Sequence, residues 1–133
     1  MLIFNIFKQE QREERAAELD LKKSNANAIS TLANTSLEAV STWINLSAAN
    51  ELNSIHELNV DRHSEFVQLI EARSNAGVGS LSDLLTAQSR SEEAQGQFLD
   101  AQMELATAEA EFIRLFGDVP DPLPPLPKAT RQP

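Results

Sequence analysis

Residues 76–88 read Ala-Gly-Val-Gly-Ser-Leu-Ser-Asp-Leu-Leu-Thr-Ala-Gln, and this stretch decides the fold. Two glycines, Gly77 and Gly79, make a tight turn between two long segments of helical character. Ser80 is a good N-cap, and Asp83 completes a variant of the capping box that starts a helix. Two helical segments predict an all-α fold, and so short a turn between them forces the two helices to run antiparallel. The fold should be a long, coiled-coil-like helical hairpin with its function at the tip.

The composition of the 133 residues favours long helices over a pocketed enzyme. Aromatic residues make up 5%, there are only four glycines, and the prolines lie after residue 119. The net charge of -9 argues against nucleic-acid binding, because phosphate repels an acidic surface. The chain has no cysteine, which excludes disulfides and thiolate metal sites.

The first helix is expected over residues 9–75, which contain no proline or glycine, after an apolar segment at residues 1–8. Its first charged turns should be solvated, and Glu18 and Lys22 are spaced to form an ion pair. An apolar stripe follows at helical spacing, with more apolar side chains beside it, which suggests neighbours on more than one side. The stripe comprises Ile29, Ala33, Leu37, Val40, Ile44, Ala48, Leu52, Ile55, Leu58, Phe66 and Ile70.

The second helix is expected over residues 81–117, after a tip turn at residues 76–80, and should end at Gly117 in a left-handed conformation. Two heptad columns predict one seam that faces a partner over many turns, and the alanines let that partner approach closely. The two heptad columns are Leu84, Ser91, Phe98, Leu105 and Phe112, and Ala87, Ala94, Ala101 and Ala108.

Residues 118–133 form a proline-rich tail that we expect to be extended or disordered.

The two helices differ in length, at about 100 Å and about 54 Å. Folded back at the glycines, the second helix reaches only to about Val40. The earlier turns of the first helix should therefore bury their apolar positions against other chains or against sequence absent from this chain. We expect an oligomer subunit or a fragment of a longer protein, since a lone two-helix hairpin is a thin core.

Chemistry-bearing motifs are weak in this sequence. His56 and His63 share a helix face but lie about 10 Å apart along the axis, too far to share one metal ion directly. The acidic residues Glu57, Asp61 and Glu65 are more simply a solvated face. There is no nucleophile elbow, P-loop or dinucleotide fingerprint. We therefore expect no enzyme, no catalytic residue, no cofactor and no metal.

Residues 1–8 are too short an apolar run for a signal peptide, and their charge follows the run where a signal peptide carries it first. We therefore expect no signal peptide in this chain. No stretch approaches the roughly 20 apolar residues of a transmembrane helix.

Residues 17–117 resemble the second helical hairpin of the TolC-like outer-membrane efflux protein family. The resemblance is clearest at the tip, where the family has an Ala-Gly turn, a serine or threonine, and then a run that starts with aspartate and ends in Ala-Gln. Here these are Ala76-Gly77, Ser80 and Asp83-Leu84-Leu85-Thr86-Ala87-Gln88. The run from Ala108 to Gly117 is similar to the family's closing helix, and Val40 to Leu46 to its aromatic segment. The first repeat and the recognisable barrel strands are missing, so the resemblance covers a C-terminal part only.

The resemblance implies a homotrimer whose subunits each contribute two hairpins to a periplasmic tunnel topped by an outer-membrane barrel. Membrane contact would then come only through the missing barrel portion, and the chain would sit at the outer membrane and periplasm. The tips would dock a periplasmic membrane-fusion adaptor. That role would fall on Ala76, Gly77, Val78, Gly79, Ser80 and Leu81.

Two further positions correspond to the family's entrance constriction. Asp83 matches a constriction aspartate, whereas Thr86 stands where a second aspartate is found, which weakens an acidic ring. A plain capping role for Asp83 explains its presence equally well.

Two functions remain open from the sequence. One is a segment of an efflux or type I secretion channel. The other is a soluble helical-hairpin interaction module, a coiled-coil structural protein with no transport role. A channel subunit needs the Gly77 and Gly79 turn to meet an adaptor, whereas a generic coiled coil would tolerate bulky residues there.

Overall fold

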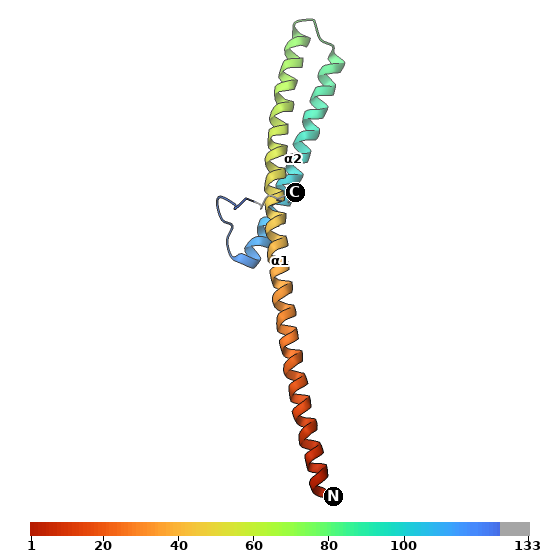
Figure 1. Cartoon of the computed structure of the whole chain (residues 1–133). Coiled ribbons are helices and arrows are strands. Elements are labelled where there is room, and N and C mark those ends of the chain that lie inside the picture. Colours follow the sequence, from red (N-terminus) through yellow and green to blue (C-terminus); the bar gives the residue numbers. More distant parts are fainter. Residues whose placement is uncertain (126–133) are drawn as a thin grey trace, which may run out of the picture. The chain divides into compact units, whose positions relative to one another are not determined.

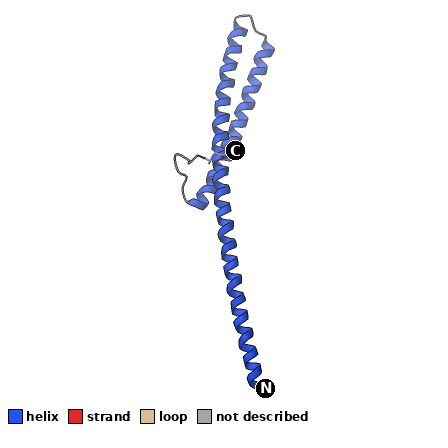
Figure 2. Cartoon of the chain, viewed as in Figure 1, coloured by secondary structure: helices blue, strands red, loops and turns tan. Residues whose placement is uncertain are grey.

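The computed structural model of the chain describes residues 1–125 and contains two helices, α1 (Leu2–Asn75) and α2 (Leu81–Phe116). Within those residues there is no strand, and α2 runs back antiparallel along the later part of α1 (Figures 1 and 2). The predicted all-α hairpin is confirmed. The chain divides into two units, residues 1–40 and residues 41–133. The end of the proline-rich tail, residues 126–133, lies outside the described residues.

The first unit is a single stretch of α1. Residues 2–8, set apart in the sequence as an apolar segment, form its first turns. Every side chain from residue 1 to residue 38 is exposed. Glu18 and Lys22 form the expected ion pair, at 3.4 Å between carboxylate oxygen and ammonium nitrogen. Because both side chains are well exposed, this pair stabilises the helix by only a few tenths of a kcal/mol.

The α2 side of the hairpin seam follows the predicted heptads. Ala87, Ala94, Ala101 and Phe112 are buried, and the intervening column positions are half-buried. A repeat of seven keeps the same face of α2 against α1 over its whole length. The half-buried positions are Leu84, Ser91, Phe98, Leu105 and Ala108.

The α1 side of the seam differs from the sequence expectation. Thr42, Leu46 and Ala49 are the buried residues of α1. The apolar stripe read from the sequence lies on another face: Ile44 and Leu52, for example, are exposed, and Ile70 alone in the stripe reaches the seam. The face that α2 covers combines two small side chains, Thr42 and Ala49, with the fully buried Leu46, so that small and large side chains alternate as interdigitated packing requires. The half-buried α1 positions nearer the tip are Asn53, His56, Asn59, Val60, His63, Val67, Ile70 and Ser74.

The far end of α2 closes as the sequence predicts. Gly117 adopts a left-handed conformation with φ 86°, and its N–H donates to the Ile113 carbonyl at 2.8 Å. One turn earlier, the rings of Phe112 and Phe116 stack with centroids 4.4 Å apart. Residues 118–125 are irregular. This end and the glycine turn fix the length of α2 that can pack against α1.

Candidate functional site: the hairpin tip

The tip begins with the end of α1, which is closed by a Schellman motif. The Gly77 N–H donates to the Ser74 carbonyl and the Val78 N–H to the Arg73 carbonyl, both at 3.0 Å. Gly77 has φ 76°, the left-handed backbone conformation that this motif requires and that residues other than glycine rarely adopt. The first glycine of the tip is therefore fixed by backbone conformation.

The second glycine is fixed by space. The Gly79 N–H also donates to the Arg73 carbonyl, at 3.1 Å, which draws the chain back over the last turn of α1. A Cβ atom at Gly79 would lie 3.1 Å from the Ser74 amide nitrogen and 3.2 Å from the Arg73 carbonyl carbon. These neighbours are backbone atoms, so they cannot swing aside as a flexible side chain would. The turn thus needs glycine at Gly77 for its backbone conformation, and a larger residue at Gly79 would have to displace backbone atoms by a few tenths of an ångström.

The tip ends where α2 begins. Ser80 is in an extended conformation and its hydroxyl accepts the Asp83 N–H at 3.1 Å, as the predicted N-cap requires. The reverse bond of a capping box, from the Ser80 amide to the Asp83 carboxylate, is not recorded within residues 1–125. Any stabilisation of the helix by the Asp83 carboxylate would therefore come from its charge in the first turn.

Of the six residues predicted for docking, residues 76–80 form the turn that joins the two helices in Figure 1, and Leu81 is the first residue of α2. The two larger apolar side chains of this set, Val78 and Leu81, are 80% and 66% exposed. In a Schellman motif the residue at the Val78 position often packs back on its own helix. Here it projects outward instead, so the tip presents apolar surface on a rigid turn.

The two predicted constriction residues lie just beyond the turn. Asp83 and Thr86 are both exposed and stand three residues apart on the first turns of α2. The Thr86 hydroxyl donates to the Ser82 carbonyl at 2.9 Å, which holds it against its own helix. The structure thus places the two side chains near each other at the tip end of α2.

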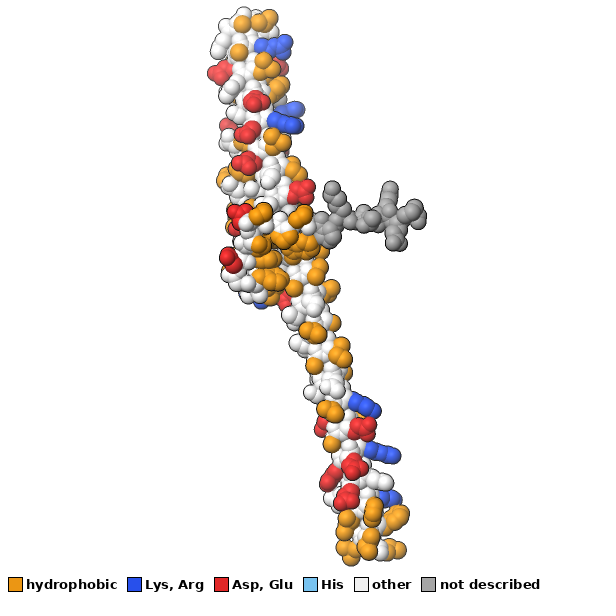
Figure 3. Space-filling model, turned by 60° about the vertical axis from the view of Figure 1, so that its left-hand side comes forward, with side chains coloured by type: hydrophobic (Ala, Val, Ile, Leu, Met, Phe, Trp, Pro, Cys, Tyr) orange, Lys and Arg blue, Asp and Glu red, His pale blue; other side chains and the backbone are white. Residues whose placement is uncertain are grey.

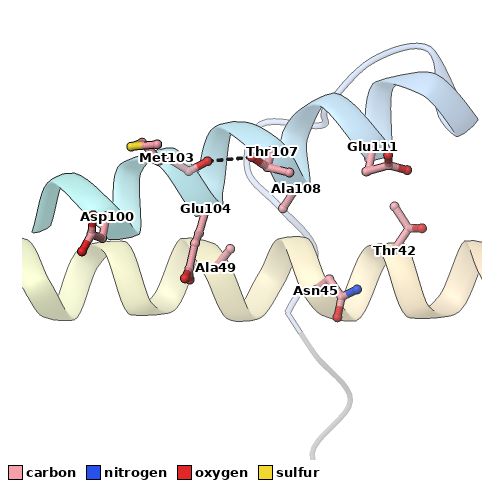
Figure 4. Close-up of a pocket in the computed structure, with 9 residues that line it drawn as sticks. All are labelled: Thr42, Asn45, Ala49, Asp100, Met103, Glu104, Thr107, Ala108 and Glu111. Atoms are coloured by element: carbon pink, nitrogen blue, oxygen red, sulfur yellow. Dashed lines mark hydrogen bonds between the residues drawn. The ribbon is translucent and has the colours of Figure 1, made fainter. Parts of the chain in front are cut away.

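A groove along the flank of the hairpin is a feature that the sequence reading missed (Figure 4). It has a volume of about 780 Å³. Thr42 and Asn45 line it from α1, and Asp100, Glu104 and Glu111 line it from α2. The spacing of seven between the two glutamates, beside the seam columns, was the signal available in the sequence. Its carboxylates make the groove acidic.

The two histidines are half-buried in the seam. Across the part of the chain that the structure describes, no three or more His, Cys, Asp or Glu side chains gather closely enough to hold a metal ion. In the same residues, no helix is both long enough and apolar enough to cross a membrane.

Comparison with known proteins identifies the family to which the chain belongs. The profile of the outer membrane efflux protein family matches residues 4–118, which is most of the chain. The chain belongs to the outer membrane efflux protein family. This is a family of transport proteins, not of enzymes. The resemblance read from the tip motif is thereby confirmed.

Among curated proteins, the chain is similar to the outer membrane efflux protein BepC of Brucella suis biovar 1 (strain 1330). The two are 26% identical over 118 residues, which are 89% of this chain and 26% of BepC. The chain therefore spans about a quarter of the length of this relative. No solved structure gives a significant match.

Proposed function

We propose that this chain is a segment of an outer-membrane efflux or type I secretion channel and forms part of its periplasmic helical tunnel. Family membership and the likeness to BepC support an efflux channel. The antiparallel hairpin supplies a wall element, and the exposed α1 stripe supplies a face for neighbouring helices. The working assembly would be a homotrimer at the outer membrane and periplasm, passing substrate without catalysis or cofactor.

The hairpin tip is the proposed docking site for a periplasmic membrane-fusion adaptor. The observation that carries this proposal is the exposed pair of Val78, on a turn held by three backbone hydrogen bonds, and Leu81, at the start of α2. A rigid turn loses little conformational entropy when it binds, so exposed apolar side chains on it make efficient anchors.

Val78 and Leu81 allow a sharper docking test than the glycines, because substitution of either glycine also disturbs the turn. The double variant Val78→Asp, Leu81→Asp should weaken pull-down by a purified adaptor by about tenfold or more. The matched control is Leu85→Asp, Leu99→Asp, which puts the same charges on exposed apolar positions of α2 beyond the turn.

Circular dichroism on both variants checks that helix content is unchanged. Equal capture of the two variants would overturn the tip assignment. That result would favour the alternative function, a helical-hairpin interaction module with no transport role.

Asp83 and Thr86 are the proposed lining of the tunnel entrance. The Asp83 side chain is exposed, and among the described residues its carboxylate accepts no hydrogen bond from the Ser80 amide. These two observations support a role beyond capping. Thr86 is uncharged and bonded to its own helix, so it would contribute size but no charge. A single ring of aspartates, one from each copy, is the expected constriction.

A further inference from the structure

The acidic groove on the flank of the hairpin has the size of a small-ligand site. It lies within the second unit, and its volume of about 780 Å³ falls in the range of about 300–1,000 Å³ that such sites occupy. Its three carboxylates, Asp100, Glu104 and Glu111, all come from α2. At about 1.5 Å of rise per residue, they extend over about 16 Å of the helix. This spread fits an elongated ligand, and the described residues hold no three such groups close enough together for a metal ion.

The negative charge of the groove is not balanced within the described chain. No lysine or arginine lines it, and neither Asp100 nor Glu104 has a recorded ion pair among residues 1–125. These two carboxylates stand four residues apart on the same face of α2, where like charges repel. Glu111 pairs with Arg114 of its own helix at 3.3 Å, but both side chains are exposed, so the pair is weak. A cationic ligand would relieve the repulsion.

A buried hydroxyl on the opposite wall marks one end of the groove. Thr42 of α1 is only 8% exposed, and among the residues that the structure describes its hydroxyl has no recorded hydrogen bond. Thr107, on the α2 side of the groove, instead donates to the Met103 carbonyl at 2.9 Å. In Figure 4, Thr42 points from α1 toward α2, and Glu111 points back toward it. Because a buried hydroxyl costs free energy when it has no partner, Thr42 and Glu111 together offer a ready position for a donor group.

Apolar groups lie between the charged positions. Ala49, Met103 and Ala108 line the groove, and Ala49 is 9% exposed. A ligand that follows the groove therefore meets carboxylates and, between them, small or flexible apolar side chains. This alternation matches a chain of methylene groups that carries ammonium groups at intervals.

We propose that the groove binds a linear aliphatic polyamine. One ammonium group donates to the Glu111 carboxylate and the Thr42 hydroxyl, and others donate to Glu104 and Asp100. The methylene segments cover the apolar part of the lining. The site lies outside the tip turn and does not rest on the channel assignment, because a hairpin interaction module would have the same groove. Failure of either proposal therefore leaves the other standing.

The hairpin as a whole attracts cations, so binding in the groove has to be separated from diffuse attraction. Residues 41–118 carry 13 acidic and four basic side chains, and Figure 3 shows acidic groups over several parts of the surface. The probe is spermidine, titrated calorimetrically into the full chain at low ionic strength. We expect saturable binding of one spermidine per chain that weakens as salt is added. Binding without saturation, or no binding, overturns the proposal.

Matched variants separate the groove from the net charge. Glu104→Gln, Glu111→Gln should weaken spermidine binding at least about tenfold, because two of the three carboxylate contacts are lost. The control Glu57→Gln, Glu65→Gln changes the net charge by the same amount on an exposed face of α1 and should bind as the parent does. Equal weakening by the two pairs would mean diffuse attraction only, and the proposal would be wrong.

A third variant tests the hydroxyl without any change of charge. Thr42→Val keeps the shape of the side chain and should weaken binding about threefold, the effect of one lost hydrogen bond. Urea unfolding followed by circular dichroism should show that this variant is no less stable than the parent, since the hydroxyl has no recorded partner in the described chain. The control Thr35→Val, at an exposed position of the first unit, should bind normally. Unchanged affinity in Thr42→Val means that the ligand does not occupy this groove.

A tethered ammonium group gives the last test. Asn45 lines the groove, so Asn45→Lys places a competing cation inside it and should lower spermidine affinity at least about tenfold. Asn50→Lys adds the same charge at an exposed position outside the lining and should lower the affinity much less. Equal losses in the two lysine variants would overturn the assignment of the ligand to the groove.

Discussion

The base and the tip half of the hairpin have the same α2 pattern but differ on α1. At the base, Thr42, Leu46 and Ala49 are buried, and Leu46 has no exposed surface (0%). From residue 53 to residue 75 no α1 side chain is buried, and the seam includes Asn53 and both histidines. On α2, buried seam residues occur in both halves, with Ala87 and Ala94 toward the tip and Phe112 toward the base. The comparison indicates that α1 sets the local stability of the hairpin and that the tip half opens more readily.

The largest expected effect is at the base. Leu46→Ala should lower the free energy of unfolding by about 3 kcal/mol, because it removes a fully buried side chain and leaves a cavity in a thin core. Urea unfolding followed by circular dichroism measures this loss. The matched control is Leu58→Ala, an exposed leucine on the same helix, which should cost well under about 1 kcal/mol. Similar losses for the two variants would mean that the base is not the anchor.

The same contrast shows what could be read from the sequence. The α2 seam, the turn and both caps were predictable, because heptad spacing, paired glycines and Ser80 each specify local geometry. The residues that form the α1 side of the seam could not be predicted from the sequence. Hydrophobic periodicity points to the most apolar face, and that face, with Ile44 and Leu52, is left exposed by α2. A helix that has apolar residues on several sides does not reveal which side its own chain will cover.

The candidate site divides in the same way. The tip residues could be found because a turn needs glycine, and the need was visible in Gly77 and Gly79. The acidic groove was missed, since it depends on which flank of α2 lies beside α1. Glu104 and Glu111, for example, meet Thr42 and Asn45 only once the pairing of the two helices is known.

A smaller and opposite effect is expected toward the tip. Asn53 is half-buried in the seam, and its Oδ1 is buried without a hydrogen-bond partner among the described residues. Asn53→Leu should therefore raise the free energy of unfolding by about 1 kcal/mol, by replacing a polar seam group with an apolar one. The control Asn50→Leu makes the same change at an exposed position and should have little effect. A destabilised Asn53→Leu chain would show that the polar seam contributes to specificity or packing.

The smallest expected effect separates the two roles of Asp83. Asp83→Asn keeps the backbone N–H that bonds to the Ser80 hydroxyl and removes only the charge in the first turn of α2. It should cost about 0.5 kcal/mol at low ionic strength and less in high salt, since the interaction with the helix dipole is screened. Asp100→Asn, in the middle of the same helix, controls for the change in net charge. A measurable loss that salt removes would show that Asp83 helps to hold the helix start. If Asp83→Asn is no less stable than Asp100→Asn, helix capping does not explain the carboxylate, and its exposed place at the tip favours the entrance role.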